Sequence, residues 1–402
     1  MKRRRVKITG IGPVTPAGIG KDEFWKGILE SVSRVRRVER FADMGAGPFV
    51  AAEVSDFNLA RYLPGVSSKR VPRHTQFALA GAALAIADAG LTIQEISAMS
   101  PLVIAGAALM DFGVINKGIE LIVRKGNQVG LPSTVLYASV CTIASAIAGQ
   151  IGGATRTLTM QTDCCSGLDA IGHAAAMVAE GEAEIAICGG AEAPIHLHPM
   201  VEFKLAGLAP NSDEAPMRLC RPFDLWRTTG VIGEGACMFV LEPETSPRLG
   251  YGFVSGYAFA TDRTADTLGG LEEAIRLALA NARFRANEID CIYAWGPGHP
   301  VIDAAEAGVL QRIFAGRLAE IPVVSIKGAV GNPLGAGGAM QAGCAALGLR
   351  DGVIPPTVNW QHPDPSCPLN LSRQARRVNS SAVLINAHGL AGVNASLILE
   401  RC

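Results

Sequence analysis

Charged side chains are scarce in this sequence, and neither sign is in excess. Only 18% of the 402 residues are charged, and 36 basic side chains offset 36 acidic ones. A chain without net charge has no general electrostatic attraction to nucleic acid or to a membrane surface. The ten cysteines include no Cys-x-x-Cys pair, which argues against a zinc site and against a disulfide framework. We therefore expect no nucleic-acid partner, no membrane partner and no metal ion.

Long apolar runs are also missing. No stretch is long enough and free enough of breakers to span a bilayer, and the apolar segment 6–8 after the basic start is too short for a signal-peptide core. A cytoplasmic location is the expectation. Apolar residues nevertheless make up 49% of the chain, and 46 glycines suit tight turns between strands and helices. These numbers predict a large core, in two domains or one duplicated unit, and a surface partly covered by a partner.

Apolar segments and small-residue helical patterns alternate through the chain in two similar series. This alternation predicts an α/β fold with largely parallel strands covered by helices. The second series begins near residue 250, so we expect a duplicated core with halves 1–245 and 246–402. The expected strands are 6–18, 102–108, 184–191, 251–258, 291–295 and 323–327, with a final hairpin around 388–392. The expected helices are one that begins at 22 and those at 75–90, 139–152, 167–181, 270–282, 302–314 and 339–350.

The most informative stretch is TMQTDCCSG, residues 159–167. It joins an apolar run to a helix start rich in small residues, so Cys164 is expected at a strand-to-helix elbow. The unpaired amides at a helix start favour a thiolate over a thiol and could hold an oxyanion. The alternative interpretation is a buried cysteine that serves only as a small hydrophobic residue.

Five stretches carry a family resemblance over nearly the whole length of the chain. They are KITGIGPVTPAG, TDCCSGLDAIGHAA, GGAEA, RPFDLWR with GEGACMFVLE, and KGAVGNPLGAGGA with VIPPTVN. On these motifs the chain resembles β-ketoacyl carrier-protein synthases of the elongating type. The resemblance implies the thiolase fold, in which a duplicated core forms a five-layer α-β-α-β-α sandwich and works as a dimer. It also implies substrates carried as thioesters on the phosphopantetheine arm of an acyl carrier protein, with no other cofactor.

Family members load an acyl group onto the elbow cysteine, here Cys164, and use two histidines to decarboxylate a malonyl thioester. Mapped by motif, the first histidine is replaced by Trp295 and the second by Asn332. Tryptophan can donate one N–H but cannot exchange a proton near neutral pH. We therefore do not expect the usual decarboxylative condensation, whereas acyl transfer to Cys164 needs only a thiolate and an oxyanion hole. The resemblance places that hole at the amides of Cys164 and Leu390.

Two other histidines are candidates for the missing proton transfer. His299 lies four residues after Trp295 in the same loop, and His388 stands two residues before Leu390. A loop histidine with a local hydrogen bond is the alternative interpretation of each.

Three buried residues complete the expected site. The resemblance assigns structural roles to Lys327, Glu306 and Asp303, and it predicts a buried ion pair between Lys327 and Glu306. Asp163 is unusual, because the family has a small residue before the nucleophile. Strand alternation predicts that the Asp163 side chain points away from Cys164.

The loop AWGPGHPVIDAAE, residues 294–306, looks most like the chain-length factors, or ketosynthase β subunits. These pair with a competent ketosynthase in type II polyketide systems and help to set product length. They lack the histidines and usually the cysteine, whereas this chain keeps Cys164.

Three interpretations follow from these motifs. The first is a chain-length-factor-like subunit of polyketide or fatty-acid synthesis, in a heterodimer with a competent ketosynthase. The second is a homodimeric acyltransferase or unusual β-ketoacyl synthase that uses Cys164 with Trp295 and Asn332. The third is a carrier-protein binding module without chemistry.

Carrier proteins are acidic, so a basic patch is expected at the mouth of the pocket. Two groups of basic residues are candidates, although an ordinary solvated surface explains any one of them equally well. The groups are Arg61, Lys69, Arg70 and Arg73, and Arg124 with Lys125.

Overall fold

A computed structural model describes residues 3–44, 47–126, 129–130, 132–153, 155–263 and 268–402. Two groups of five strands form its centre, and in both groups the first two neighbouring pairs are antiparallel and the last two are parallel. The first group, in spatial order, is β1 (Val6–Thr15), β8 (Gly235–Pro243), β7 (Ala186–Glu192), β5 (Leu102–Gly106) and β6 (Arg156–Met160). The second is β9 (Gly252–Thr261), β15 (Val393–Glu400), β14 (Ala382–His388), β10 (Cys291–Tyr293) and β11 (Val323–Val324). The shared order is the duplication that the sequence predicts.

The two groups join edge to edge through β1 and β9. Only Lys7 with Phe253 and Ile8 with Gly252 pair at this junction. The strands therefore form one continuous eleven-stranded sheet, in which β2 (Gly18–Ile19) pairs with β1. The expected two five-stranded sheets are present as its halves, joined by this short contact.

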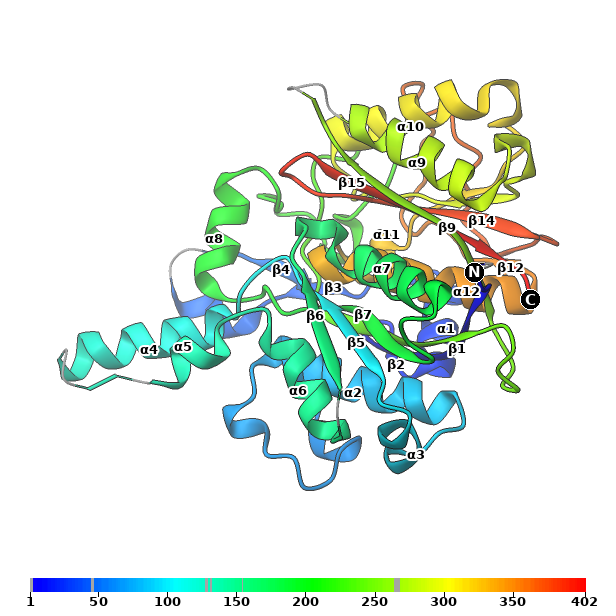
Figure 1. Ribbon diagram of the computed structural model, residues 1–402. Helices are drawn as coiled ribbons and strands as arrows, with labels where there is room; N and C mark the ends of the chain where they lie inside the picture. Colours follow the sequence, from blue (N-terminus) through cyan, green and yellow to red (C-terminus); the bar gives the residue numbers. More distant parts are fainter. Residues whose placement is uncertain (1–2, 45–46, 127–128, 131, 154, 264–267) are drawn as a thin grey trace.

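Helices form three layers around the two halves of the sheet (Figure 1). Two helices lie between the halves and pack on each other, and the others cover the outer faces. The inner pair is α7 (Ser166–Glu180) and α12 (Gly337–Asp351). The first outer face carries α2 (Arg73–Asp88) and α6 (Thr142–Ile151), and the second carries α9 (Gly269–Ala282), on which α10 (Pro300–Phe314) packs. The layers are those of the expected α-β-α-β-α sandwich.

Small residues allow the inner helices to approach closely. The sequence of α12, GGAMQAGCAALGLRD, is buried along all but its last two residues. A Cβ on Gly167, in the first turn of α7, would lie 2.6 Å from the Gly335 carbonyl oxygen. This close packing brings the start of α7, which follows Cys164, against the loop that carries Asn332.

The expected strand 323–327 ends early, because the chain turns into the short helix α11 (Lys327–Val330). The Ser325 hydroxyl accepts a hydrogen bond from the Lys327 amide at 3.3 Å and donates to the Gly296 carbonyl at 2.8 Å. Four helices were not predicted from the sequence: α3 (Ile93–Ala98), α4 (Phe112–Lys125), α5 (Ser133–Tyr137) and α8 (Leu197–Leu205). The remaining elements are α1 (Lys21–Leu29), β3 (Val35–Arg37), β4 (Val50–Ala52), β12 (Val353–Ile354) and β13 (Arg376–Arg377). Within the described part of the chain, no helix has the length and apolar character needed to cross a membrane.

Candidate functional site

Cys164 lies in a short 3₁₀ turn, Asp163–Cys165, between the end of β6 and the start of α7. The Ser166 hydroxyl fixes this elbow, since it accepts from the Thr162 amide at 2.9 Å and donates to the Asp163 carbonyl at 2.5 Å. Asp163 adopts a positive φ of 52°, an uncommon conformation for a residue with a side chain. Cys164 is only 2% exposed. The predicted strand-to-helix elbow is present, and its cysteine is buried.

Cys164 borders a cavity with about 30 Å³ of room. All the residues proposed from the sequence as catalytic or oxyanion candidates line it: Cys164, Trp295, Asn332, His299, His388 and Leu390. The rest of its lining is apolar or glycine: Phe203, Leu208, Gly230, Ile232, Pro297, Ile302 and Leu334. Pockets that enclose an organic ligand usually have about 300–1,000 Å³. An acyl chain can therefore enter only if side chains or a loop at this cavity move.

Trp295 occupies the place of the first family histidine. Its side chain is 2% exposed, and the Lys327 ammonium lies 3.6 Å from its ring centroid. A cation at this distance is attracted by the negative face of the indole. Gly337 packs so closely that a Cβ there would lie 2.9 Å from two ring carbons. The indole thus contacts both a cation and a helix backbone, and it forms one wall of the cavity.

Lys327 and Glu306 do not form the predicted ion pair. In the described residues, the Lys327 ammonium donates to Gln341 Oε1 at 2.6 Å. Glu306 instead accepts hydrogen bonds from the amides of Trp295 and Gly296, both at 2.9 Å. Because these two amides already satisfy the Glu306 carboxylate, the Lys327 ammonium binds Gln341 and lies over the indole face of Trp295. Burial lowers the pKa of Lys327 to about 7 and raises the pKa of Glu306.

Asp303 holds the same loop from its other end. Its carboxylate accepts from the amides of Phe223 at 2.7 Å and Gly298 at 3.1 Å, and it lies 3.7 Å from Arg227 Nε. Burial raises the pKa of Asp303 to about 7. Asp303 and Glu306 therefore act on the loop 294–299 through its backbone amides, which agrees with the structural role expected for both.

Asn332 stands at the place of the second family histidine. Its backbone amide donates to the Val231 carbonyl at 2.6 Å. Its side-chain oxygen is buried and has no hydrogen-bond partner among the described residues. A buried acceptor without a donor is costly, so this oxygen suits an N–H or O–H group that a ligand brings into the cavity.

The contacts of His388 identify which ring nitrogen carries its proton. His388 Nδ1 lies 2.8 Å from Asn394 Oδ1. The Asn394 amide nitrogen donates to Asp262 Oδ1 at 2.9 Å and to the Gly392 carbonyl at 3.0 Å. Since the asparagine oxygen must then accept, neutral His388 carries its proton on Nδ1 and keeps a lone pair on Nε2. Burial lowers the pKa of His388, which favours this neutral form.

His299 has the opposite tautomer. It precedes α10, and its Nδ1 accepts a hydrogen bond from the Val301 amide at 3.3 Å. The proton of the neutral ring is therefore on Nε2, and burial together with Arg227 lowers its pKa. His299 serves as a helix cap, in line with the local hydrogen bond considered from the sequence.

The predictions for Asp163 and for the Cys164 thiol were wrong. Asp163 Oδ1 lies 3.5 Å from Cys164 Sγ, and its Oδ2 accepts from the Ala391 amide at 3.1 Å. The positive φ of the elbow turns the carboxylate toward the thiol instead of away from it. Burial, and then the charge of Asp163, raise the pKa of Cys164 well above its ordinary value. The neutral thiol is therefore favoured over the expected thiolate.

The two amides expected to form the oxyanion hole remain available. Within the described structure, neither the Cys164 amide nor the Leu390 amide donates a hydrogen bond to the protein. Leu390 is 51% exposed and lies in the turn between β14 and β15. Both residues border the same cavity, as an oxyanion hole formed by the two amides requires.

None of the six proposed carrier-protein contacts lines the cavity. Arg73 is bound by the buried Glu234 in a two-point ion pair, at 3.0 and 2.7 Å, so its charge neutralises a buried carboxylate. Arg61 and Lys69 are exposed, whereas the side chain of Arg70 lies outside the described residues. The exposed Arg124 and Lys125 end α4, where Arg124 pairs with Glu120 at 3.0 Å.

A buried carboxylate beside the elbow was not predicted from the sequence. Glu192 ends β7 and accepts from the amides of Ala108 at 2.7 Å and Gly335 at 3.2 Å. Burial raises its pKa to about 8. Phe203 and Leu208 were likewise not predicted as part of the cavity wall. The acidic end of the GGAEA strand could have indicated Glu192, but no local pattern indicates which apolar residues meet Cys164.

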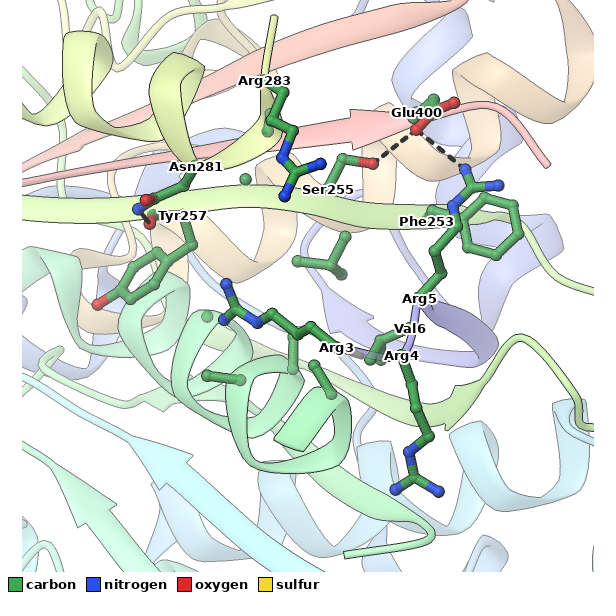
Figure 2. A pocket seen from close by; sticks show the side chains of 17 residues that line it. Arg3, Arg4, Arg5, Val6, Phe253, Ser255, Tyr257, Asn281, Arg283 and Glu400 are labelled. Atoms are coloured by element: carbon green, nitrogen blue, oxygen red, sulfur yellow. Dashed lines mark hydrogen bonds and ion pairs between the residues drawn. The ribbon is translucent and has the colours of Figure 1, made fainter. Parts of the chain in front are cut away.

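A larger cavity of about 430 Å³ lies between the N-terminal segment, β9 and the end of α9 (Figure 2). Arg3, Arg4, Arg5 and Arg283 are among the residues that line it. Arg5 lies 3.7 Å from the Phe253 ring centroid and pairs with Glu400 at 3.0 Å. This cavity shares no lining residue with the Cys164 cavity, so it forms no part of the site described above.

A duplicated five-layer sandwich with a cysteine at the elbow before a central helix defines a thiolase-fold protein of the condensing type. Family models agree with this class: the N-terminal domain of β-ketoacyl synthases matches residues 3–246, and the C-terminal domain matches residues 249–361. The chain belongs to the β-ketoacyl synthase family, which confirms the resemblance seen in its motifs.

Relatives include the α and the β subunit of the ketoacyl synthase of the tetracenomycin polyketide synthase. A putative polyketide β-ketoacyl synthase 1 of Streptomyces virginiae is 33% identical, with 99% of this chain and 98% of the relative covered. The ketoacyl synthase β subunit of the tetracenomycin polyketide synthase of Streptomyces glaucescens is 32% identical, with 98% of each covered.

Two solved structures share the fold and a similar level of identity. The ishigamide ketosynthase/chain length factor matches with a TM-score of 0.93 and 30% identity, over 100% of both chains. A type II acyl-carrier protein in complex with its ketosynthase, bound to the hexaketide, matches with a TM-score of 0.89 and 25% identity, over 100% of both chains.

Proposed function

We propose that this chain is a chain-length-factor-like subunit that pairs with a competent ketosynthase in type II polyketide or fatty-acid synthesis. The observation that carries the proposal is the buried and closely packed indole of Trp295 at the first histidine position. A histidine there can transfer a proton, whereas the indole can only donate its N–H, and Lys327 occupies its face. Loss of a proton carrier and of an electrostatic donor each reduce the rate of a condensing step by about 10²–10³ or more. The condensation must then come from the partner.

The named relatives support a paired subunit. One is a ketoacyl synthase β subunit, and one solved neighbour is a ketosynthase/chain length factor. The other neighbour is an acyl-carrier protein with its ketosynthase, which supports carrier-bound acyl chains as the substrate of this chain. The orphaned oxygen of Asn332 would accept from an amide N–H of the phosphopantetheine arm. Arg61, Lys69, Arg124 and Lys125 remain the proposed contacts for the acidic carrier.

The surface that we propose for the partner is the open edge of β6. This strand is the last of its half of the sheet and pairs with β5 alone in the described structure. An open edge strand readily adds a strand from another protein. Leu158 of β6 is 45% exposed, and the preceding helices α4 and α5 also expose apolar side chains. These are Ile119, Ile122, Val123, Val135 and Leu136.

The test of this pairing is co-purification with a type II ketosynthase α subunit and native mass spectrometry. We expect a one-to-one heterodimer that Leu158→Lys breaks, because a buried lysine at the strand edge cannot be solvated. Leu249→Lys is the matched control, since Leu249 is 92% exposed outside the sheet. A chain that forms only homodimers, or a heterodimer indifferent to Leu158→Lys, contradicts the proposed surface.

Acyl transfer to Cys164 is the second candidate function. The lone pair of His388 Nε2 and the free amides of Cys164 and Leu390 favour it. In this reaction the Cys164 sulfur bonds to the thioester carbonyl carbon while the bond from that carbon to the pantetheine sulfur breaks. The thiol proton passes through His388 to the departing pantetheine thiolate, so no other reactant is needed.

Intact-protein mass after incubation with acyl carrier thioester measures this reaction. A stoichiometric acyl adduct that Cys164→Ala abolishes establishes the transfer. Absence of an adduct from folded protein excludes it and leaves the paired-subunit function. All ten cysteines are unpaired, which fits the reducing cytoplasm that we propose as the location.

A further inference from the structure

Asp163 makes contacts that no other residue of the elbow makes. Its Oδ1 lies 3.5 Å from Cys164 Sγ, while its Oδ2 accepts from the Ala391 amide at 3.1 Å. The two oxygens of one carboxylate therefore join the thiol to the turn between β14 and β15. Asp163 reaches both only because its φ is 52°, a conformation that residues with side chains adopt at a cost.

The turn 389–392 is built against this carboxylate. The Gly392 amide donates to the Gly389 carbonyl at 3.0 Å, and the Gly389 amide donates to the Val393 carbonyl at 2.8 Å. A Cβ on Gly389 would lie 2.8 Å from Asp163 Cβ, so the absence of a side chain lets the turn approach. The turn also carries Leu390, whose amide is the second oxyanion donor.

We infer that Asp163 is a positioning residue that keeps Cys164 as a neutral thiol at rest and fastens the turn 389–392 over it. The inference deepens the proposed function. It rests on that function in one respect, since it treats the Cys164 cavity as the site of the acyl chain. It explains how a subunit can retain the family cysteine and still not load acyl chains by itself. A negative charge beside the sulfur opposes the second negative charge that a thiolate would bring.

The other groups around the sulfur do not offset this charge. Glu192, whose own pKa is raised to about 8, adds negative charge once it ionises, and Cys165 is a buried thiol. Lys327 interacts electrostatically with Cys164, but it donates to Gln341 and faces the indole of Trp295, and burial lowers its pKa to about 7, which weakens its positive charge at neutral pH. The titratable groups around Cys164 are thus Asp163 and Cys165 of its own turn, Glu192 of β7, Lys327 of α11, His388 of β14 and His299, which precedes α10.

Asp163→Asn tests the inference because asparagine keeps the size of the side chain and an oxygen for the Ala391 amide but removes the charge. The probe is iodoacetamide, and the readout is the rate of alkylation at each cysteine against pH, measured by peptide mass spectrometry. The exposed Cys141 and Cys402 are internal reference thiols, whose rates should not change.

We expect the midpoint of the Cys164 alkylation profile to fall by at least one pH unit in Asp163→Asn, which is about tenfold faster alkylation at a pH below both midpoints. Looser packing alone would raise the rate at every pH without moving the midpoint, and that result overturns the inference. An unchanged profile, or a Cys164 that stays unreactive in the variant, also overturns it. Asp163→Ala must shift the midpoint in the same direction, which keeps the test valid if Asp163→Asn does not fold.

The assay separates this inference from the proposed function. It uses neither a carrier protein nor a partner subunit, so a failed heterodimer leaves its outcome unaffected. Conversely, an unshifted midpoint would remove the role of Asp163 while the chain could still pair with a ketosynthase.

Discussion

Replacement of Trp295 by alanine should both open the acyl cavity and destabilise the fold. The indole is 2% exposed, carries the Lys327 ammonium 3.6 Å from its centroid, and packs against Gly337 of α12. Its removal leaves a void beside Cys164 and deprives a buried cation of its aromatic face. Both losses act on the folded state.

The magnitude follows from these contacts. Truncation of a buried tryptophan costs about 3–5 kcal/mol, and loss of a desolvated cation–π contact accounts for up to about 2 kcal/mol within a change of this kind. Trp295→Phe keeps an aromatic face for Lys327 and much of the apolar contact, so we expect less than about 2 kcal/mol. Lys327→Met with Trp295→Ala should show a coupling free energy of about 1–2 kcal/mol, because the two side chains touch.

Urea denaturation followed by circular dichroism, at a pH below 7 where Lys327 holds its proton, provides the free energies of unfolding. The three tryptophans that remain of four provide a second probe, and coincident transitions justify a two-state treatment. Additive effects of the Trp295 and Lys327 substitutions would refute the cation–π contact between these side chains. A loss of stability below about 1 kcal/mol in Trp295→Ala, less than any tightly packed tryptophan allows, would refute the close packing of the indole.

Further predictions concern charge and packing. Arg73→Ala should cost about 2 kcal/mol of stability, because Glu234 is left buried without its partner, but its affinity for the carrier protein in a binding titration should not change. Lys69→Glu should weaken carrier-protein binding and leave the stability unchanged. Burial lowers the pKa of Lys327 from 10.5 to about 7, so between these values only the unfolded chain holds the proton. Stability should therefore rise with pH in that window, and Lys327→Met should flatten the rise in urea titrations at several pH values. Gly167→Ala should lower the melting temperature, since its Cβ would meet a carbonyl at 2.6 Å, and an unchanged melting temperature would contradict the close packing.

Much of the fold follows from patterns that are local in the sequence. The elbow at Cys164 was predicted because an apolar strand runs directly into small residues, and α7 begins at Ser166 as that pattern requires. The duplicated core was predicted because apolar segments and helical patterns alternate in two similar series along the chain. The gathering of Trp295, Asn332 and His388 around one cavity rested on the family motifs, and the structure brings these residues together.

The failures involve choices between partners that are distant in the sequence. Arg73 was expected on a basic surface, but a buried glutamate 161 residues away binds it. Lys327 was expected to pair with Glu306, but the backbone amides of Trp295 and Gly296 donate to that carboxylate instead. Asp163 was placed by strand alternation, which does not apply in a turn with positive φ. Each outcome depends on which hydrogen-bond partners the fold brings to a polar side chain, and spacing along the sequence does not contain this information.

Condensation of malonyl and acyl carrier thioesters, monitored by the release of carbon dioxide, decides whether this chain carries out the family's chemistry by itself. The isolated chain should release none above the background of its Cys164→Ala variant. Its complex with a competent ketosynthase should condense, and that activity should survive Cys164→Ala in this subunit. Condensation by the isolated chain that disappears with Cys164→Ala would contradict the account, because Trp295 and Asn332 would then support the chemistry assigned here to the partner.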